Sequence, residues 1–180
     1  MHYKINKNYG NQVLNHIDNV ANRKDLGSLP EWDLSDLYDT PSSKEINLDL
    51  KKALKLSESF AVSYEHNLSK LSADEMLACV NAQEEISLLM GRLISFAALR
   101  YYQKTNDTSR TKFLTDIQDK ITNCSSHMIF FSLEFNTLDE EHLKKLLSSN
   151  RELNRYKAVF DRMRALKPYQ LSDELEKFLH

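Results

Sequence analysis

The 180-residue sequence has few of the residues that interrupt regular structure. It contains three glycines, three prolines and two cysteines. Sheets joined by tight turns use glycine and proline more often, so this shortage favours long helices. Two cysteines are too few for the disulfide framework of a small secreted domain. Cys79 and Cys124 are therefore predicted to be reduced, core-facing thiols in a cytoplasmic protein.

An excess of one charge and a long apolar run are also missing. The chain has 24 Lys and Arg against 26 Asp and Glu, a net charge of -2, which gives no field to attract nucleic acid or an anionic membrane. The most apolar segment, residues 86–102, is interrupted by polar residues and is shorter than the roughly 18 continuous apolar residues of a membrane span. The first ten residues lack the apolar core of a signal peptide. We expect a cytoplasmic protein without a nucleic-acid or membrane partner.

The sequence divides into a polar tail and a helical domain. Residues 1–28 are rich in Asn and Lys, and they carry too little apolar surface to offset the entropy of ordering. We therefore predict a mobile tail over 1–28. Residues 29–180 are predicted to form one domain that starts with an irregular lead segment. The hydrophobic content of 41% is typical of a soluble globular protein.

The lead segment contains the only tryptophan of the chain. Pro30 requires extended backbone before it, and Asp33 can cap a short turn. Trp32 and Tyr38 are then free to bury large apolar surfaces. Trp32 is accordingly predicted to anchor the lead segment on the helices. An aromatic ligand site is the weaker alternative, because anchoring aromatic residues are commoner.

Apolar residues at i, i+3 and i+4 spacing predict an all-α fold, an antiparallel helical bundle of about five to six helices, two of them long. The short connector at 104–107 predicts that the following helix returns antiparallel. The apolar second half of the longest helix is expected to be covered by neighbours. The predicted helices cover residues 45–67, 73–103, 108–135, 137–147, 150–166 and 172–180.

Capping residues mark the starts of several predicted helices. The spacing Ser72 to Glu75 is a capping box, and Thr137 to Glu140 and Ser149 to Glu152 are predicted to be two more. Gly91 lies inside the longest helix, where glycine costs about 1 kcal/mol relative to alanine. That cost suggests that another helix approaches closely at Gly91.

The sequence contains no motif for catalysis. The six histidines, at 2, 16, 66, 127, 142 and 180, never occur at i and i+4, and none is followed by Glu. The zinc-binding helix H-E-x-x-H is therefore absent. The three glycines do not form a phosphate-binding loop, a dinucleotide fingerprint or a nucleophile elbow. We predict no catalytic, cofactor-binding or metal-binding residue in this chain.

Three weaker features have structural interpretations. Glu134 lies among phenylalanines, and a paired structural carboxylate is favoured there over a catalytic one. Cys79 and His127 could meet, but a buried structural pair is favoured over a catalytic dyad. Residues 25–50 are acidic and residues 151–167 are basic, so we hypothesise that these two segments lie close together.

Four segments, taken in order, resemble oligoendopeptidase F, of the M3 family of zinc metallopeptidases. The first, residues 29–38 (LPEWDLSDLY), resembles the opening signature of that family. The others are 91–97 (GRLISFA), 130–134 (FFSLE) and 164–172 (RALKPYQLS), the last followed by a further glutamate. Tyr169 stands where the family more often has histidine. The resemblance covers about residues 29–179.

The resemblance implies that this chain corresponds to the N-terminal helical domain, a wall of the channel that admits short peptides. In that family, the catalytic part carries H-E-x-x-H and a further glutamate as zinc ligands. No residue of this sequence matches those positions, so no catalytic residue is carried over. Zinc is expected only in the intact family enzyme.

The last predicted helix ends at His180 inside an amphipathic pattern, so Phe178 and Leu179 are expected to be exposed. This ending fits the front portion of such an enzyme, whether truncated, split or a fragment. The chain is then predicted to be inactive alone. Its partner would be either a separate catalytic domain or a second copy bound through the C-terminal helix. The alternative is a free-standing helical protein-interaction module without enzymatic activity.

Overall fold

The computed structural model describes residues 31–179, so the predicted tail at 1–28 lies outside the described residues. The chain divides into two units, Met1–Trp32 and Asp33–His180. The second unit contains all the helices described here. The predicted boundary between tail and domain, at residues 28 and 29, stays a prediction.

The unit Asp33–His180 is all-α, as predicted, and residues 31–179 contain no strand. Eight α-helices and two short 3₁₀-helices make up the described part. In chain order they are α2 (Lys44–Tyr64), η1 (Leu68–Lys70), α3 (Ala73–Gln103), α4 (Thr108–Ser126), α5 (Ile129–Thr137), α6 (Glu140–Ser149), α7 (Arg151–Asn154), α8 (Lys157–Ala165), η2 (Lys167–Tyr169) and α9 (Asp173–Leu179).

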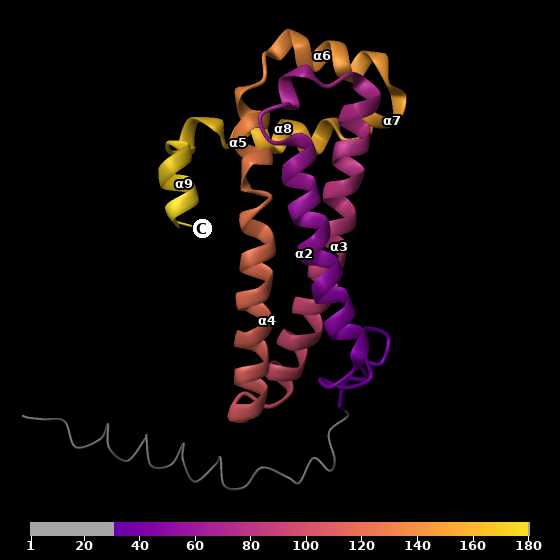
Figure 1. The fold of residues 1–180 in the computed structure, drawn as a ribbon, viewed down its shortest axis with the longest axis vertical. Coiled ribbons are helices and arrows are strands. Elements are labelled where there is room, and N and C mark those ends of the chain that lie inside the picture. Colours follow the sequence, from indigo (N-terminus) through magenta and orange to yellow (C-terminus); the bar gives the residue numbers. More distant parts are fainter. Residues whose placement is uncertain (1–30, 180) are drawn as a thin grey trace, which may run out of the picture. The chain divides into compact units, whose positions relative to one another are not determined.

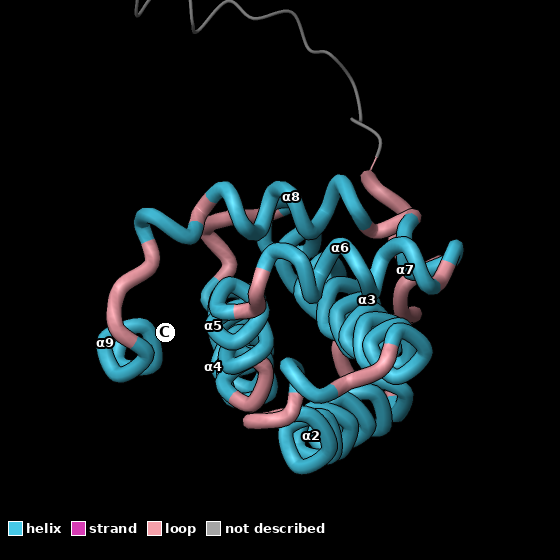
Figure 2. The backbone as a smooth tube through the Cα atoms, turned by 90° about the horizontal axis from the view of Figure 1, so that it is seen from above, coloured by secondary structure: helices cyan, strands magenta, loops and turns pink. Residues whose placement is uncertain are grey.

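The helices α2, α3 and α4 lie side by side with alternating direction, and each packs on the other two (Figure 1). The prediction of an antiparallel return after 104–107 is therefore confirmed. The shorter helices α6, α7 and α8 gather at the end of this bundle where α2 ends and α3 begins (Figure 1). The last helix, α9, lies at the outer side of α5, and a loop joins it to η2 (Figure 2).

Side-chain caps set the starts of α3 and α4, whereas α2 begins without one. The hydroxyl of Ser72 accepts from the Glu75 backbone N–H, and the Glu75 carboxylate accepts from the Ser72 N–H, so the predicted capping box of α3 is confirmed. Asp107 caps α4, because its Oδ1 accepts from the N–H groups of Ser109 and Arg110. Each cap satisfies N–H groups that have no partner inside the helix.

The other two predicted capping boxes are wrong. α6 is capped by Asp139 and α7 by Asn150. The hydroxyl of Thr137 instead donates to the Glu134 carbonyl, and that of Ser149 donates to the Lys145 carbonyl. Both hydroxyls therefore serve the end of the preceding helix, since serine and threonine bond readily to carbonyls three or four residues earlier.

Two predicted helices are each divided. The predicted helix 108–135 is interrupted at His127 and Met128, and the hydroxyl of Ser125 donates to the Ile121 carbonyl just before the break. The predicted helix 150–166 is interrupted at Arg155 and Tyr156, whose N–H groups bond three residues back. These tighter turns change the direction of the chain without glycine or proline. The spacing of apolar residues is therefore not enough to predict them.

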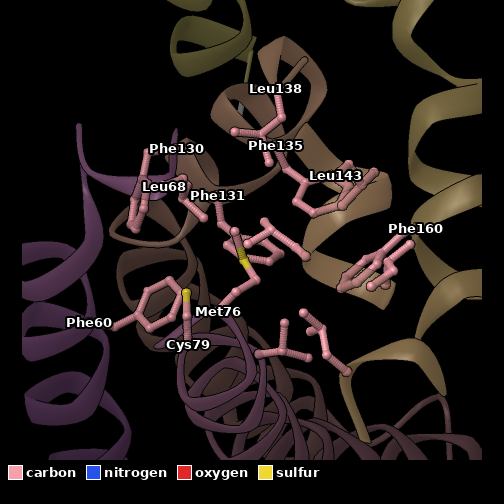
Figure 3. Packing of buried hydrophobic residues seen from close by; sticks show 14 of the residues in the cluster. Phe60, Leu68, Met76, Cys79, Phe130, Phe131, Phe135, Leu138, Leu143 and Phe160 are labelled. Carbon is pink, nitrogen blue, oxygen red and sulfur yellow. The ribbon is translucent and has the colours of Figure 1, made fainter. Parts of the chain in front are cut away.

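The core consists of two clusters. The larger joins the end of α2, η1, the first half of α3, and α5 to α8, and Figure 3 shows its phenylalanines around Met76. Phe135 and Phe160 pack with tilted rings whose centroids are 4.6 Å apart, and both are almost fully buried. The smaller cluster contains Tyr38 and Phe96, at the opposite end of α3. Burying each such ring contributes about 1.5–3 kcal/mol, so the fold depends on both clusters.

Two expectations about the longest helix are wrong. A Cβ added at Gly91 would have no heavy atom within 4 Å, so no helix approaches there. Leu88 is 75% exposed, so the apolar second half of α3 is covered only in part. The helix is apolar there for its packing on α2 and α4, which cover two of its sides.

Both cysteines are buried free thiols, as predicted. Burial raises the pKa of Cys79 to about 12, and the nearby carboxylate of Glu134 acts in the same direction. None of the helices within residues 31–179 has the length and apolar character to cross a membrane.

We predict that Gly91→Ala raises the free energy of unfolding by about 1 kcal/mol, because the methyl group meets no neighbour and glycine is the poorer helix former. Urea unfolding measures the change. The reverse substitution at Ala98, a partly exposed position of the same helix, is the control and should destabilise the protein. A loss of stability in Gly91→Ala would contradict this view of α3.

Asp107 makes the stability of the protein depend on acid pH. Hydrogen bonds from Ser109 and the Arg110 N–H lower the pKa of Asp107 below its usual 3.8. Because the pKa of Asp107 is lower in the folded protein than in the unfolded chain, its charged carboxylate stabilises the fold at pH values above the unfolded-state pKa. This stability is lost as the pH falls through the lower, folded-state pKa. Asp107→Asn keeps an accepting cap, so we expect it to lose less stability than the unchanged chain between about pH 6 and about pH 2.5. Urea midpoints at both pH values test this, and equal losses would contradict it.

Candidate functional site

The first two motifs of the resemblance meet at the end of α3 distant from α8. Tyr38, from the lead segment, is buried, and its hydroxyl donates to Oδ2 of Asp49 at 2.7 Å. The guanidinium of Arg92 lies 4.3 Å from the centre of the Tyr38 ring. Its Nε donates to the Leu37 carbonyl at 3.0 Å, and its Nη2 donates to the same oxygen. A side chain of the second motif therefore holds the backbone and the ring of the first.

The lead segment is anchored by Tyr38, and the prediction that Trp32 is the anchor is wrong. Trp32 is 55% exposed, whereas Tyr38 is 3% exposed and packs edge-on against Phe96 with ring centroids 5.3 Å apart. The Asp33 side chain accepts from the Ser35 N–H, so the predicted short turn is confirmed. The turn places Tyr38 where its hydroxyl finds a carboxylate. Burial, together with Asp49, raises the pKa of Tyr38.

The third motif ties α5 to the end of α2. The Glu134 carboxylate accepts from the His66 N–H at 2.6 Å, and His66 Nδ1 lies 3.6 Å from the same oxygen. His66 has a φ of 65°, in the left-handed region that few non-glycine residues adopt. The favoured interpretation of Glu134 as a paired structural carboxylate agrees with this geometry.

The fourth motif joins α8, η2 and α9 to α5 and α6. Arg164 Nη2 donates to the Leu138 carbonyl at 2.9 Å and lies 3.3 Å from Glu140 Oε2. Asn136 Nδ2 donates to Gln170 Oε1 at 2.7 Å, and the Leu171 N–H donates to Glu176. Asn136 does not belong to any of the four motifs, although its amide directly follows Phe135 in an apolar helix. Tyr169, the departure from the family pattern, is 81% exposed.

The hypothesis that the acidic and basic segments lie close together is wrong for the described residues. The start of α2 and the helix α8 lie at opposite ends of the bundle (Figure 1). Asp49 instead pairs with Arg92 at 3.5 Å. On α8, Lys157 pairs with Asp161 and Arg164 with Glu140. Asp49, Lys157 and Arg164 thus each pair with a charge outside the other segment, because exposed ion pairs contribute too little to dictate long-range packing.

Residues 31–179 provide no metal centre. No three or more His, Cys, Asp or Glu side chains in this part of the chain lie close enough together to hold a metal ion. A zinc peptidase site needs three such ligands, so the described residues do not fit zinc. His2, His16 and His180 lie outside the described residues. Burial and the Glu134 carboxylate raise the pKa of Cys79, which disfavours the thiolate that a nucleophilic cysteine needs.

An apolar surface extends over the last part of the described chain, from α8 to α9. Leu175, Phe178 and Leu179 are at least half exposed, as the sequence predicted for the last two. We call the exposed apolar residues of this region the C-terminal apolar surface: Leu166, Tyr169, Leu171, Leu175, Phe178 and Leu179. Exposed apolar residues that lie together mark interaction sites more often than isolated ones do.

We predict that Tyr38→Phe lowers the free energy of unfolding by about 1–2 kcal/mol, because the substitution leaves the Asp49 carboxylate without its hydroxyl donor. The matched control is Tyr102→Phe, since Tyr102 lies on the same bundle and is 62% exposed. Urea unfolding of both variants measures the difference. Equal stabilities would show that the Tyr38 hydroxyl does not anchor the lead segment.

Comparisons with known proteins agree with the resemblance. A family model described as Oligopeptidase F, for the N-terminal part of M3 peptidases, matches residues 134–180. The chain is 27% identical over 155 residues to "Oligoendopeptidase F, chromosomal" of Lactococcus lactis subsp. cremoris, and 26% identical over 161 residues to "Oligoendopeptidase F, plasmid" of the same organism. It is 23% identical over 164 residues to "Oligopeptidase PepF" of Bacillus subtilis (strain 168).

These alignments cover 85–89% of this chain but only 23–26% of each relative. The chain thus spans about a quarter of the length of the curated relatives it matches. No solved structure matches it significantly. The chain is therefore homologous to the N-terminal region of oligopeptidase F.

Proposed function

We propose that this chain is the N-terminal, peptide-channel-forming part of an oligoendopeptidase F-like zinc metalloendopeptidase that acts on short peptides. It contributes a rigid helical wall and has no hydrolytic activity alone. The observation that supports the proposal is the extent of the alignments: nearly all of this chain is matched, against a quarter of each relative. The remaining three quarters of a relative offer room for a catalytic part.

The contacts of the described residues support a wall rather than a reactive centre. The side chains of the four motifs tie helices to one another: Arg92 holds the lead segment, Glu134 holds the end of α2, and Arg164 holds the start of α6. None of the three is directed to a group of metal ligands within residues 31–179. Zinc and the activated water are accordingly assigned to the catalytic part, and no step of the hydrolysis is assigned to this chain.

The alternative function is a free-standing helical module that binds another protein without hydrolysing anything. The C-terminal apolar surface is compatible with it, because that surface would serve a binding module as well as an enzyme domain. The two functions differ in one measurable respect. Only the first requires that peptide turnover depends on this chain.

We predict that the purified 180-residue chain does not cleave a short quenched fluorescent peptide, with or without added zinc. The matched partner is the remainder of the chromosomal Lactococcus lactis oligoendopeptidase F, produced without the residues that align with this chain. Adding this chain should raise the zinc-dependent turnover by that remainder, because it restores the missing wall. Fluorescence measures turnover, and a chelator that abolishes it identifies the zinc-dependent share.

Two results would contradict the proposal. Zinc-dependent turnover by the chain alone would show that it has its own active centre. Unchanged turnover by the remainder in the presence of this chain would favour the interaction module. Tyr102→Phe is a suitable variant control, since Tyr102 is 62% exposed.

A further inference from the structure

A hollow of about 330 Å³ opens between α5, α8, η2 and α9. Half of its eight lining residues are apolar, among them Met163, Leu166 and Tyr169. The polar half includes the amides of Asn136 and Gln170 and the carboxylate of Glu176. A second hollow, of about 460 Å³, shares Met163 and continues along α5 and α8 towards α3. The two together form an open groove, which we call the α5–α8 groove.

One polar atom beside this groove has no partner. Asn136 is only 6% exposed, and its Nδ2 donates to Gln170 Oε1. Its Oδ1 accepts no hydrogen bond from any described residue. A buried acceptor left unpaired costs free energy comparable to a lost hydrogen bond, so such groups are rare in folded proteins. An occupant of the groove that supplies one N–H would remove this cost.

The surface around the groove has the character of an interface. Leu166 is 62% exposed and Tyr169 is 81% exposed at its edge, and both belong to the C-terminal apolar surface. An occupant of the groove would therefore bury apolar area as well as satisfy Asn136. A central apolar contact with one buried hydrogen bond is typical of the energetically important part of an interface.

We propose that the α5–α8 groove is the docking site for an apolar segment of the catalytic part, one that presents an unpaired N–H to Asn136, as the first turn of a helix does. This inference rests on the proposed function. Two observations point to the catalytic part as the partner: the length of the relatives beyond the aligned region, and the position of the matched family segment. Three quarters of each relative lie outside the alignment, and the matched family segment, 134–180, includes Asn136 and the C-terminal apolar surface.

The matched variants for the test are Leu166→Glu and Leu48→Glu. Leu166 is 62% exposed at the groove, and Leu48 is 63% exposed on α2, so both changes place a carboxylate at an equally accessible leucine. The partner is the same remainder of the chromosomal Lactococcus lactis enzyme, and calorimetry measures the dissociation constant. Leu166→Glu should weaken binding about tenfold or more, and Leu48→Glu should leave it within about twofold.

A second variant tests the hydrogen bond itself. Asn136→Leu keeps the branched shape of the side chain and removes the acceptor, and it should weaken binding about fivefold if its helical content is unchanged. Leu166→Glu keeps the test valid even if Asn136→Leu fails to fold, because position 166 is exposed. Full-strength binding by Leu166→Glu would overturn the docking site.

The outcomes separate the docking site from the proposed function. Binding that Leu166→Glu weakens, without any gain in turnover, supports the docking site and overturns the proposed function. A gain in turnover that Leu166→Glu leaves unchanged supports the proposed function and overturns the docking site. Sedimentation of the chain alone should show a monomer. If the chain forms a dimer that Leu166→Glu dissociates, a second copy is the occupant of the groove and the docking proposal is overturned. If the remainder does not bind the chain at all, both the docking site and the proposed function are overturned.

Discussion

Arg92 and Asp49 hold an irregular segment of the chain against the helices. The Arg92 guanidinium donates to the Leu37 carbonyl and covers the Tyr38 ring, while Asp49 accepts from the Tyr38 hydroxyl. Without these contacts the lead segment would leave a backbone carbonyl and a phenol unpaired beside an apolar cluster, which is costly. The smaller core cluster, from Tyr38 to Phe96, is complete only when the segment is held in this way.

The same device recurs at the other end of the bundle. Glu134 fixes the left-handed backbone at His66, and Arg164 bonds the carbonyl of Leu138 between two helices. In each case one charged side chain bonds a backbone group in a loop, where no helix supplies a partner. The bundle therefore relies on apolar burial for its helices and on a few charge-assisted hydrogen bonds for its connections.

Periodicity in the sequence predicted the helices because each buries one apolar stripe, and the capping box at Ser72 predicted the start of α3. The breaks at His127 and Arg155 were missed, since a turn that bonds three residues back changes direction without changing composition. The burial of Tyr38 was predicted together with that of Trp32, but the partner of the Tyr38 hydroxyl was not. That partner is the carboxylate of Asp49, eleven residues after Tyr38, and only the folded structure shows that the two groups meet.

The four motifs indicated which side chains carry the connections, but not what they contact. Arg92 and Arg164 were recognised only as members of family patterns, and Asn136 was not recognised at all. Its significance depends on burial and on an unpaired oxygen, and neither property can be read from spacing. The sequence likewise indicated exposed apolar residues near Phe178, whereas the groove beside them is formed by α5, α8 and η2 together.

The most direct test of the account replaces Leu166 by a photo-crosslinking amino acid in the full chain, inside the cells that produce it. Mass spectrometry then identifies the captured peptides. The account predicts peptides from a polypeptide that carries H-E-x-x-H, joined at the α5–α8 groove. Peptides from a second copy of this chain, or from proteins without that zinc-binding sequence, would contradict it.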